Sequence, residues 1–75
     1  MFDLLSNCGS YTVVLVDNNK TTMSKVCVSM EDAKQVAYRI IQKKGYKMRK
    51  DQNNYNSKSI YCHNNIEFHI NRLIG

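Results

Sequence analysis

The sequence predicts a single small α+β domain, with the element order ββαβββ and one amphipathic helix packed on one face of an antiparallel sheet. Three observations predict this fold. An Asn-Asn pair near the N-terminus lies between two β-branched runs, a helical apolar repeat follows, and a second Asn-Asn pair lies between two strand-like runs. The 75 residues, 43% of them hydrophobic, are expected to form one domain over 1–75 with a core of modest size.

The first hairpin is expected over residues 11–16 and 21–28. Asn18 and Asn19 suit a two-residue type I′ turn, because asparagine tolerates positive φ. This turn predicts two cross-strand pairs, Val16 with Thr21 and Val14 with Met23. The same register predicts one face with Tyr11, Val13, Leu15, Val26 and Val28, and another with Thr12, Val14, Val16, Met23, Lys25 and Cys27.

The helix is expected over about residues 30–44. Ser29 is placed as its N-cap, acidic residues fill the first turn and lysines the last, and Gly45 can adopt the left-handed conformation that ends a helix. The apolar positions follow the helical period and predict a narrow stripe that packs on a sheet: Ala33, Val36, Ala37, Ile40 and Ile41.

Three more strands are expected after the helix. Residues 46–50 alternate apolar and basic side chains, 51–57 are a polar loop, and 58–63 pairs with 66–71 around a type I′ turn. The predicted register of this hairpin puts Tyr61, Ile66, Phe68 and Ile70 on one face and Ile60, Cys62, Glu67 and His69 on the other. Two end segments, 1–9 and 72–75, are expected to be a short helix or coil and a loosely held end.

Positive charge is concentrated in the middle of the chain. Seven of the eleven basic residues lie between Lys34 and Lys50, where there is no acidic residue, and the net charge is +5. Clustered charge attracts a polyanion or an acidic protein surface better than dispersed charge. If the helix covers the Tyr46 side of the sheet, Lys47 and Arg49 project from the other side. The candidate binding residues are Lys25, Arg39, Lys43, Lys44, Lys47, Arg49, Lys50 and, for stacking on a base, the loop residue Tyr55.

Residues for catalysis or metal binding are few. Cys62 and His63 are neighbours on a strand and point to opposite faces, so they cannot form a nucleophile and base pair. The only arrangement that places titratable groups together is Cys62 with Glu67 and His69 on one predicted face. Zinc-type Cys or His spacing is absent from the sequence. We therefore expect no catalytic residue, no metal and no cofactor.

The expected compartment is the cytoplasm. Three cysteines at wide spacing do not form a disulfide framework, which fits a reducing environment. No apolar run approaches the roughly 20 residues that span a bilayer, and the first residues do not resemble a signal peptide, so no membrane partner is expected. Nine asparagines without proline or tryptophan are typical of an AT-rich coding sequence, which would suit a virus, a phage, a mobile element or an AT-rich cellular genome.

The expected function is therefore binding without catalysis. The Lys/Arg-rich patch would dock on an anionic macromolecule, with nucleic acid or a nucleoprotein as the leading partner and an acidic protein surface as the other. The alternative is a small phage-type inhibitor or accessory factor that occludes a host protein in the host cytoplasm, using the open sheet face or a strand edge. Either of these surfaces could also form a homodimer.

One short run has a family resemblance. The residues KKGYKMRKD, 43–51, resemble the helix-to-sheet passage of small ribonuclease toxins of the HicA type, in which a glycine and an aromatic residue lead a basic strand. The resemblance covers about ten residues and implies RNA cleavage as a third alternative. Those toxins carry Gly-Ser-His on the next strand, whereas this chain has Asn56, Ser57 and Lys58 there.

Overall fold

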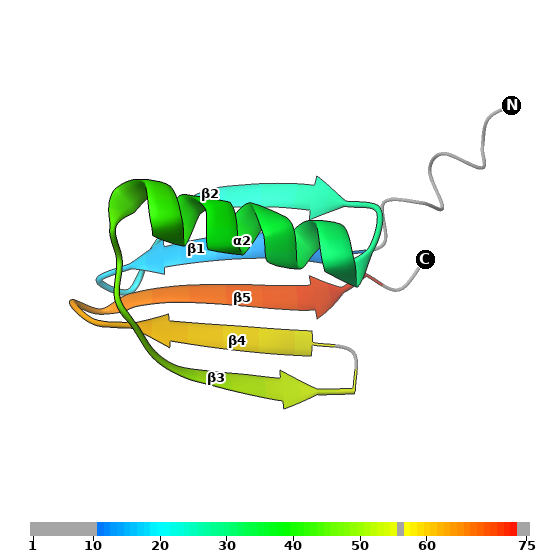
Figure 1. Cartoon of the computed structure of the whole chain (residues 1–75). Coiled ribbons are helices and arrows are strands. Elements are labelled where there is room, and N and C mark those ends of the chain that lie inside the picture. The colour runs from blue at the N-terminus through cyan, green and yellow to red at the C-terminus, as the bar shows by residue number, and fades with distance from the viewer. Residues whose placement is uncertain (1–10, 56, 74–75) are drawn as a thin grey trace, which may run out of the picture.

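A computed structural model of the chain describes residues 11–55 and 57–73 and shows the expected order ββαβββ (Figure 1). The elements are β1 (Tyr11–Asp17), β2 (Lys20–Cys27), α2 (Met30–Lys44), β3 (Met48–Asn54), β4 (Ser57–Cys62) and β5 (Ile66–Arg72). The expected helix or coil at 1–9 lies outside the described residues, as do 74 and 75. In the described part of the chain, no helix has the length and apolar character needed to span a bilayer.

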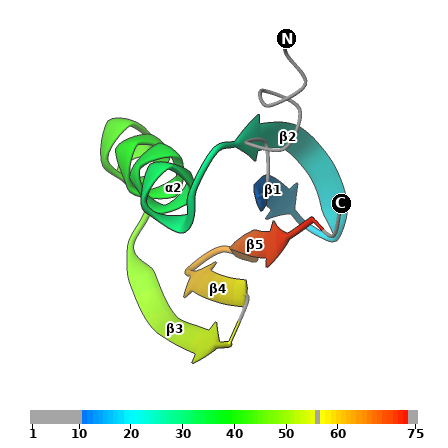
Figure 2. The same ribbon diagram turned by 90° about the vertical axis from the view of Figure 1, so that its right-hand side faces the viewer.

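The five strands form one antiparallel sheet in the order β2-β1-β5-β4-β3. The last strand, β5, is therefore the centre of the sheet, and β2 and β3 are its edges. The helix α2 packs on one face over β1, β5 and β2. Figure 2 shows the strands end-on, with α2 on one side of the twisted sheet.

The core lies between α2 and the sheet. The helix contributes Ala33, Ala37 and Ile41, and the small side chains of the two alanines allow it to approach the strands closely. The sheet contributes larger buried residues, chiefly Val13, Leu15, Ile60, Phe68 and Ile70. Each fully buried large side chain contributes about 1.5–3 kcal/mol relative to exposure. The narrow apolar stripe of the helix thus packs against the sheet, as the sequence predicted.

Both ends of α2 are capped as expected. The Ser29 hydroxyl oxygen accepts a hydrogen bond from the backbone N–H of Asp32 at 3.1 Å. At the other end Gly45 has φ +71°, and the N–H groups of Gly45 and Tyr46 donate to carbonyl oxygens of the last turn at 3.3 and 3.0 Å. The helix therefore stops at Lys44 and the chain turns toward β3.

The first hairpin differs from the expected register. The turn at Asn18 and Asn19 and the pair Val16 with Thr21 are confirmed, and both asparagines have positive φ. Thr22 is then an extra residue in a β-bulge, and its hydroxyl donates to the Leu15 carbonyl at 3.4 Å. The bulge reverses the faces of the residues that follow. The helix side of β2 thus holds Met23, Lys25 and Cys27, and Val26, which the sequence placed with the core, is 56% exposed.

The last hairpin is shifted as well, because its turn has three residues rather than two. Cys62 pairs with Ile66, and His63, Asn64 and Asn65 form the turn. The expected faces were therefore wrong for β4. Ile60 and Cys62 join the core, and Tyr61 lies on the opposite face with Glu67 and His69. The backbone N–H of Asn18 donates to the Asn65 carbonyl at 3.1 Å, so the two hairpin turns are joined.

The strand β3 begins later and ends later than expected, and it includes most of the predicted loop 51–57. Met48 pairs with Cys62 and Lys50 with Tyr61, so Arg49 is the extra residue of a second bulge. The polar sequence of β3 has a structural partner in Lys58 of β4. That side chain is buried, and its Nζ donates to Asn53 Oδ1 at 2.9 Å and to Asp51 Oδ2 at 3.4 Å.

Candidate nucleic-acid interface

The sheet face turned away from α2 is built from rows of cross-strand neighbours. The row nearest the joined turns contains Thr21, Val16, Glu67, Tyr61 and Lys50, and the middle row contains Ser24, Val14, His69, Ser59 and Gln52. The face is thus apolar over β1 and polar over β5, β4 and β3. None of the elements described above packs over it (Figure 2).

A hydrogen-bonded chain fixes the imidazole of His69 on this face. Ser59 Oγ lies 3.0 Å from His69 Nδ1, and His69 Nε2 lies 2.9 Å from Glu67 Oε1. The hydroxyl and carboxylate hold the ring from both sides, so its orientation is set before any ligand arrives. The Tyr61 ring meets it edge-on, with centroids 6.0 Å apart.

Lys50 adds a cation to the same cluster. Its Nζ lies 5.9 Å from the centroid of the Tyr61 ring, within the range of a cation–π contact. The bulge at Arg49 is the reason, because it moves Lys50 from the helix side of β3 to the row that contains Tyr61. The sequence predicted Lys47 and Arg49 on this face, and the structure places Lys50 there instead.

The Ser59, His69 and Glu67 chain has the order of a nucleophile, base and orienting acid, but it lies on the surface of a continuous sheet. Both β4 and β5 have a partner strand on each side, so their N–H groups are committed to the ladders rather than directed at an oxyanion. The predicted group of Cys62 with Glu67 and His69 was wrong. Cys62 is on the core face, 1% exposed, and burial raises the pKa of its thiol.

Metal ligands are not gathered in the described ranges 11–55 and 57–73, where no group of three His, Cys, Asp or Glu side chains could hold an ion. Cys27 and Cys62 are both free and buried. The groups that the structure does gather are cations, aromatic rings, neutral polar side chains and the carboxylate of Glu67.

The basic residues at the end of α2 lie beside the joined hairpin turns (Figure 1). The connection to β3 is held there because the His63 N–H donates to the Lys47 carbonyl at 2.9 Å. Five exposed cations lie between the last turn of α2 and the first residues of β3, and within the described residues none has a carboxylate within 4.0 Å: Lys43, Lys44, Lys47, Arg49 and Lys50. We call these five residues the basic end.

A surface depression of about 460 Å³ lies at the basic end. Lys44 and Lys47 line it from one side and His63 and Asn64 from the turn between β4 and β5. Two ammonium groups, an imidazole and an amide are suitable partners for the oxygen atoms of a phosphate. The depression is therefore a candidate position for an anion at the basic end.

Three of the candidate residues lie elsewhere. Lys25 and Arg39 line a groove between β2 and α2, because the bulge at Thr22 turns Lys25 toward the helix. Tyr55 is 94% exposed but lies after the far end of β3 from the basic end (Figure 1). Lys58, which would flank it, is buried and hydrogen-bonded.

Sequence reasoning missed the aromatic part of the site. Tyr61 and His69 were assigned to opposite faces, and they lie together because of the three-residue turn. One signal was present: placing Ile60 and Cys62 in the core gives four neighbouring apolar residues with Ile66 and Phe68, and it puts Tyr61 beside Glu67. Known proteins offer no guide, since no family model, curated protein or solved structure matches the chain.

Proposed function

We propose that the protein binds single-stranded nucleic acid without catalysis, with phosphates on the basic end and bases on Tyr61 and His69. The observation that carries the proposal is the position of Lys50. It belongs to the basic end and also lies over the Tyr61 ring, so the cationic track and the aromatic surface are continuous. Single-strand binders need this combination of backbone contacts and stacking rings.

The geometry favours single strands over duplex. The aromatic surface is part of a sheet, and sheet-based RNA binders stack exposed bases on such a surface. Bases inside a duplex are already stacked and cannot reach Tyr61. The fixed ring of His69 reduces the entropy lost on binding, because Ser59 and Glu67 already orient it.

The first test is the salt dependence of binding. A fluorescently labelled oligouridine and oligothymidine of equal length would be titrated by anisotropy between about 50 and 200 mM salt, over which phosphate-driven binding weakens steeply. Lys47→Glu and Lys50→Glu should each weaken binding and reduce the slope of log K against log salt by about 1. The slope is the informative quantity, since it counts phosphate contacts.

The matched control is Lys34→Glu, which changes the net charge by the same amount. Lys34 lies toward the other end of α2 and pairs with Glu31 at 2.9 Å. This variant should keep the wild-type slope. Equal loss in Lys34→Glu and Lys50→Glu would show that only net charge matters, and the proposed site would be wrong.

The second test separates nucleic acid from an acidic protein surface as the occupant of the basic end. Tyr61→Phe keeps the ring and should retain binding, whereas Tyr61→Leu should lose about 1–3 kcal/mol, the usual contribution of one stacked base. An acidic protein would not depend on the ring in this way. If both variants bind the oligonucleotide equally, bases do not stack on Tyr61.

A further inference from the structure

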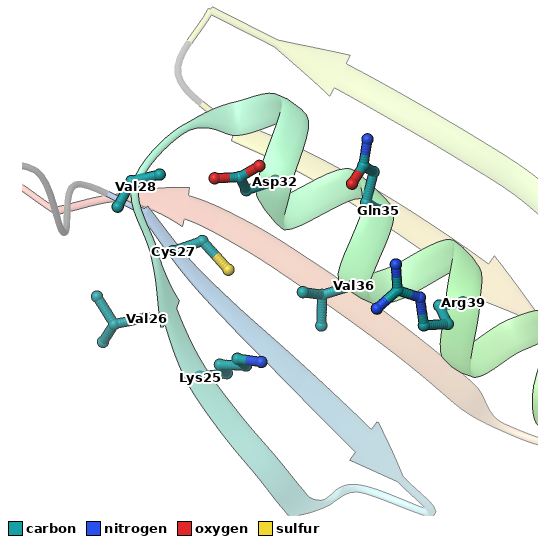
Figure 3. A pocket seen from close by; sticks show the side chains of 8 residues that line it. All are labelled: Lys25, Val26, Cys27, Val28, Asp32, Gln35, Val36 and Arg39. Carbon is teal, nitrogen blue, oxygen red and sulfur yellow. The ribbon is translucent and has the colours of Figure 1, made fainter.

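A second candidate site lies on the helix side of the molecule, in the groove between β2 and α2. Figure 3 shows Lys25 and Cys27 of β2 directed toward Val36 and Arg39 of α2, with Val26 pointing away. Residues of these two elements and Val28, which lies between them in the chain, line an open groove of about 290 Å³. The floor of the groove is apolar near Cys27 and Val36, and its two walls carry cations at Lys25 and Arg39.

The strand that borders this groove is a sheet edge. Among the described residues β2 pairs only with β1, so alternate N–H and C=O groups point outward from its other side. An edge strand in this condition can accept an added strand. Both edge strands carry a bulge, at Thr22 in β2 and at Arg49 in β3, but β3 also carries successive charges at Lys50 and Asp51 and is therefore the less suitable edge.

We propose that an extended acidic segment of a partner protein adds as a strand to the free edge of β2. Its side chains alternate between the two faces of the sheet. A carboxylate placed beside Lys25 would also approach Arg39, and the side chain two positions along would cover Cys27 and Val36. The residue between them would meet Val26, which is exposed on the other face.

Charge selects this occupant over a second copy of the chain. Within the described residues neither Lys25 nor Arg39 has a carboxylate within 4.0 Å, so the pair offers two cations to a ligand. Asp32 is the acidic residue at the groove, and it lines it from the first turn of α2. Two copies joined through β2 would bring together two chains that each carry a net charge of +5.

The recognition pattern is short enough to test with synthetic peptides. The probe contains Val-Val-Glu-Val-Val between Thr residues, which presents the same pattern in either strand direction, and its counterpart has Lys in place of Glu. Titration calorimetry with the full chain should show binding of the Glu peptide and at least tenfold weaker binding of the Lys peptide. Methylating alternate peptide nitrogens should abolish binding, because the added strand then loses its donors.

Charge-swap variants test the groove itself. The double variant Lys25→Glu with Arg39→Glu should reverse the preference and bind the Lys peptide more tightly. Lys47→Glu, at the basic end, should leave the preference for the Glu peptide unchanged. Equal binding of both peptides, or a preference that follows Lys47 rather than Lys25, would overturn the proposal.

Two further outcomes are decisive. Undiminished binding of the methylated peptide would exclude strand addition. A concentration-dependent dimer that is lost in Val26→Glu, without any peptide binding, would assign this edge to a second copy and contradict the proposal. Because the groove and the basic end use different residues, the oligonucleotide and the Glu peptide should bind together, and failure of either site leaves the other measurable.

Discussion

Lys50 and Lys58 occur on neighbouring strands, yet their surroundings differ. Lys58 is 7% exposed, and Asn53 and Asp51 satisfy its ammonium group. Lys50 is exposed and lies over Tyr61. A count of the basic residues in the sequence would assign both lysines to a cationic surface. The number of basic residues therefore overstates the charge available to a ligand, and burial decides which of them can bind.

The burial of Cys62 predicts how the stability of the fold changes with pH. Its burial raises the pKa of the thiol above the ordinary value of 9.0. Between the unfolded and the folded pKa, the unfolded chain has lost this proton and the folded chain has kept it, so stability falls as pH rises. The favourable contribution is complete below about pH 9 and decreases above it, by up to about 1.4 kcal/mol per pH unit.

Urea unfolding at pH 8 and pH 10 would measure this effect. The wild type should lose more stability between the two values than Cys62→Ala, even though the variant starts lower because a core atom is missing. The comparison cancels the titration of tyrosines and lysines, which both proteins share. An equal loss in the two proteins would mean that Cys62 ionises alike in the folded and unfolded chains.

For the helix and the hairpins, short sequence signals correctly predicted the features that depend on adjacent residues alone. Ser29 and Gly45 marked both ends of α2, and the two Asn-Asn pairs marked both tight turns, because cap and turn conformations depend on a few adjacent residues. The bulge at Thr22, the bulge at Arg49 and the third residue of the last turn were not predicted. Each is selected by which side chains reach the core.

These three irregularities had the largest effect on the candidate site. A shift of one residue reverses every later side chain on a strand. The bulge at Thr22 therefore moved Lys25 into the groove, and the bulge at Arg49 moved Lys50 onto the open face. The sequence supplied the list of candidate basic residues, but it did not predict the surface on which Lys25, Arg49 and Lys50 lie.

The left-handed conformation of Gly45 at the end of α2 predicts how substitutions there change the stability of the fold. Gly45 has φ +71° and open space where the Cβ of another residue would lie, so a substitution there meets a conformational cost without a steric clash. Gly45→Ala should destabilise the fold by about 1 kcal/mol, whereas Gly45→Asn should cost less because asparagine tolerates this conformation. Chemical unfolding measures both, and equal stability of the wild type and Gly45→Ala would contradict the assigned cap.

For the whole molecule, the decisive feature is the position of β5 between β1 and β4. This order brings the last strand beside the first and joins their turns through Asn18 and Asn65. The fold class was predicted and is confirmed, but the strand order was not, since pairing between distant segments leaves no periodic signal in one sequence. The contact of His69 with Ser59 belongs instead to the hairpin of β4 and β5, so the aromatic site depends on the three-residue turn of that hairpin.

The layers also give the molecule two separate surfaces. The helix covers β2, β1 and β5 on one face and forms the groove at the β2 edge. The other face carries Tyr61 and His69 and continues through Lys50 to the basic end. The two proposals therefore concern separate surfaces, with single-stranded nucleic acid proposed for one side and an acidic peptide for the other.

The most direct test of the nucleic-acid proposal is to map the binding surface by NMR. Amide shifts of the labelled protein would be followed as a short unstructured oligonucleotide is added at low salt. We predict the largest changes at Lys47, Lys50, Tyr61 and His69, with little change at Tyr55. Changes centred on Tyr55 or on the groove at Lys25, with Tyr61 and His69 unaffected, would contradict the account.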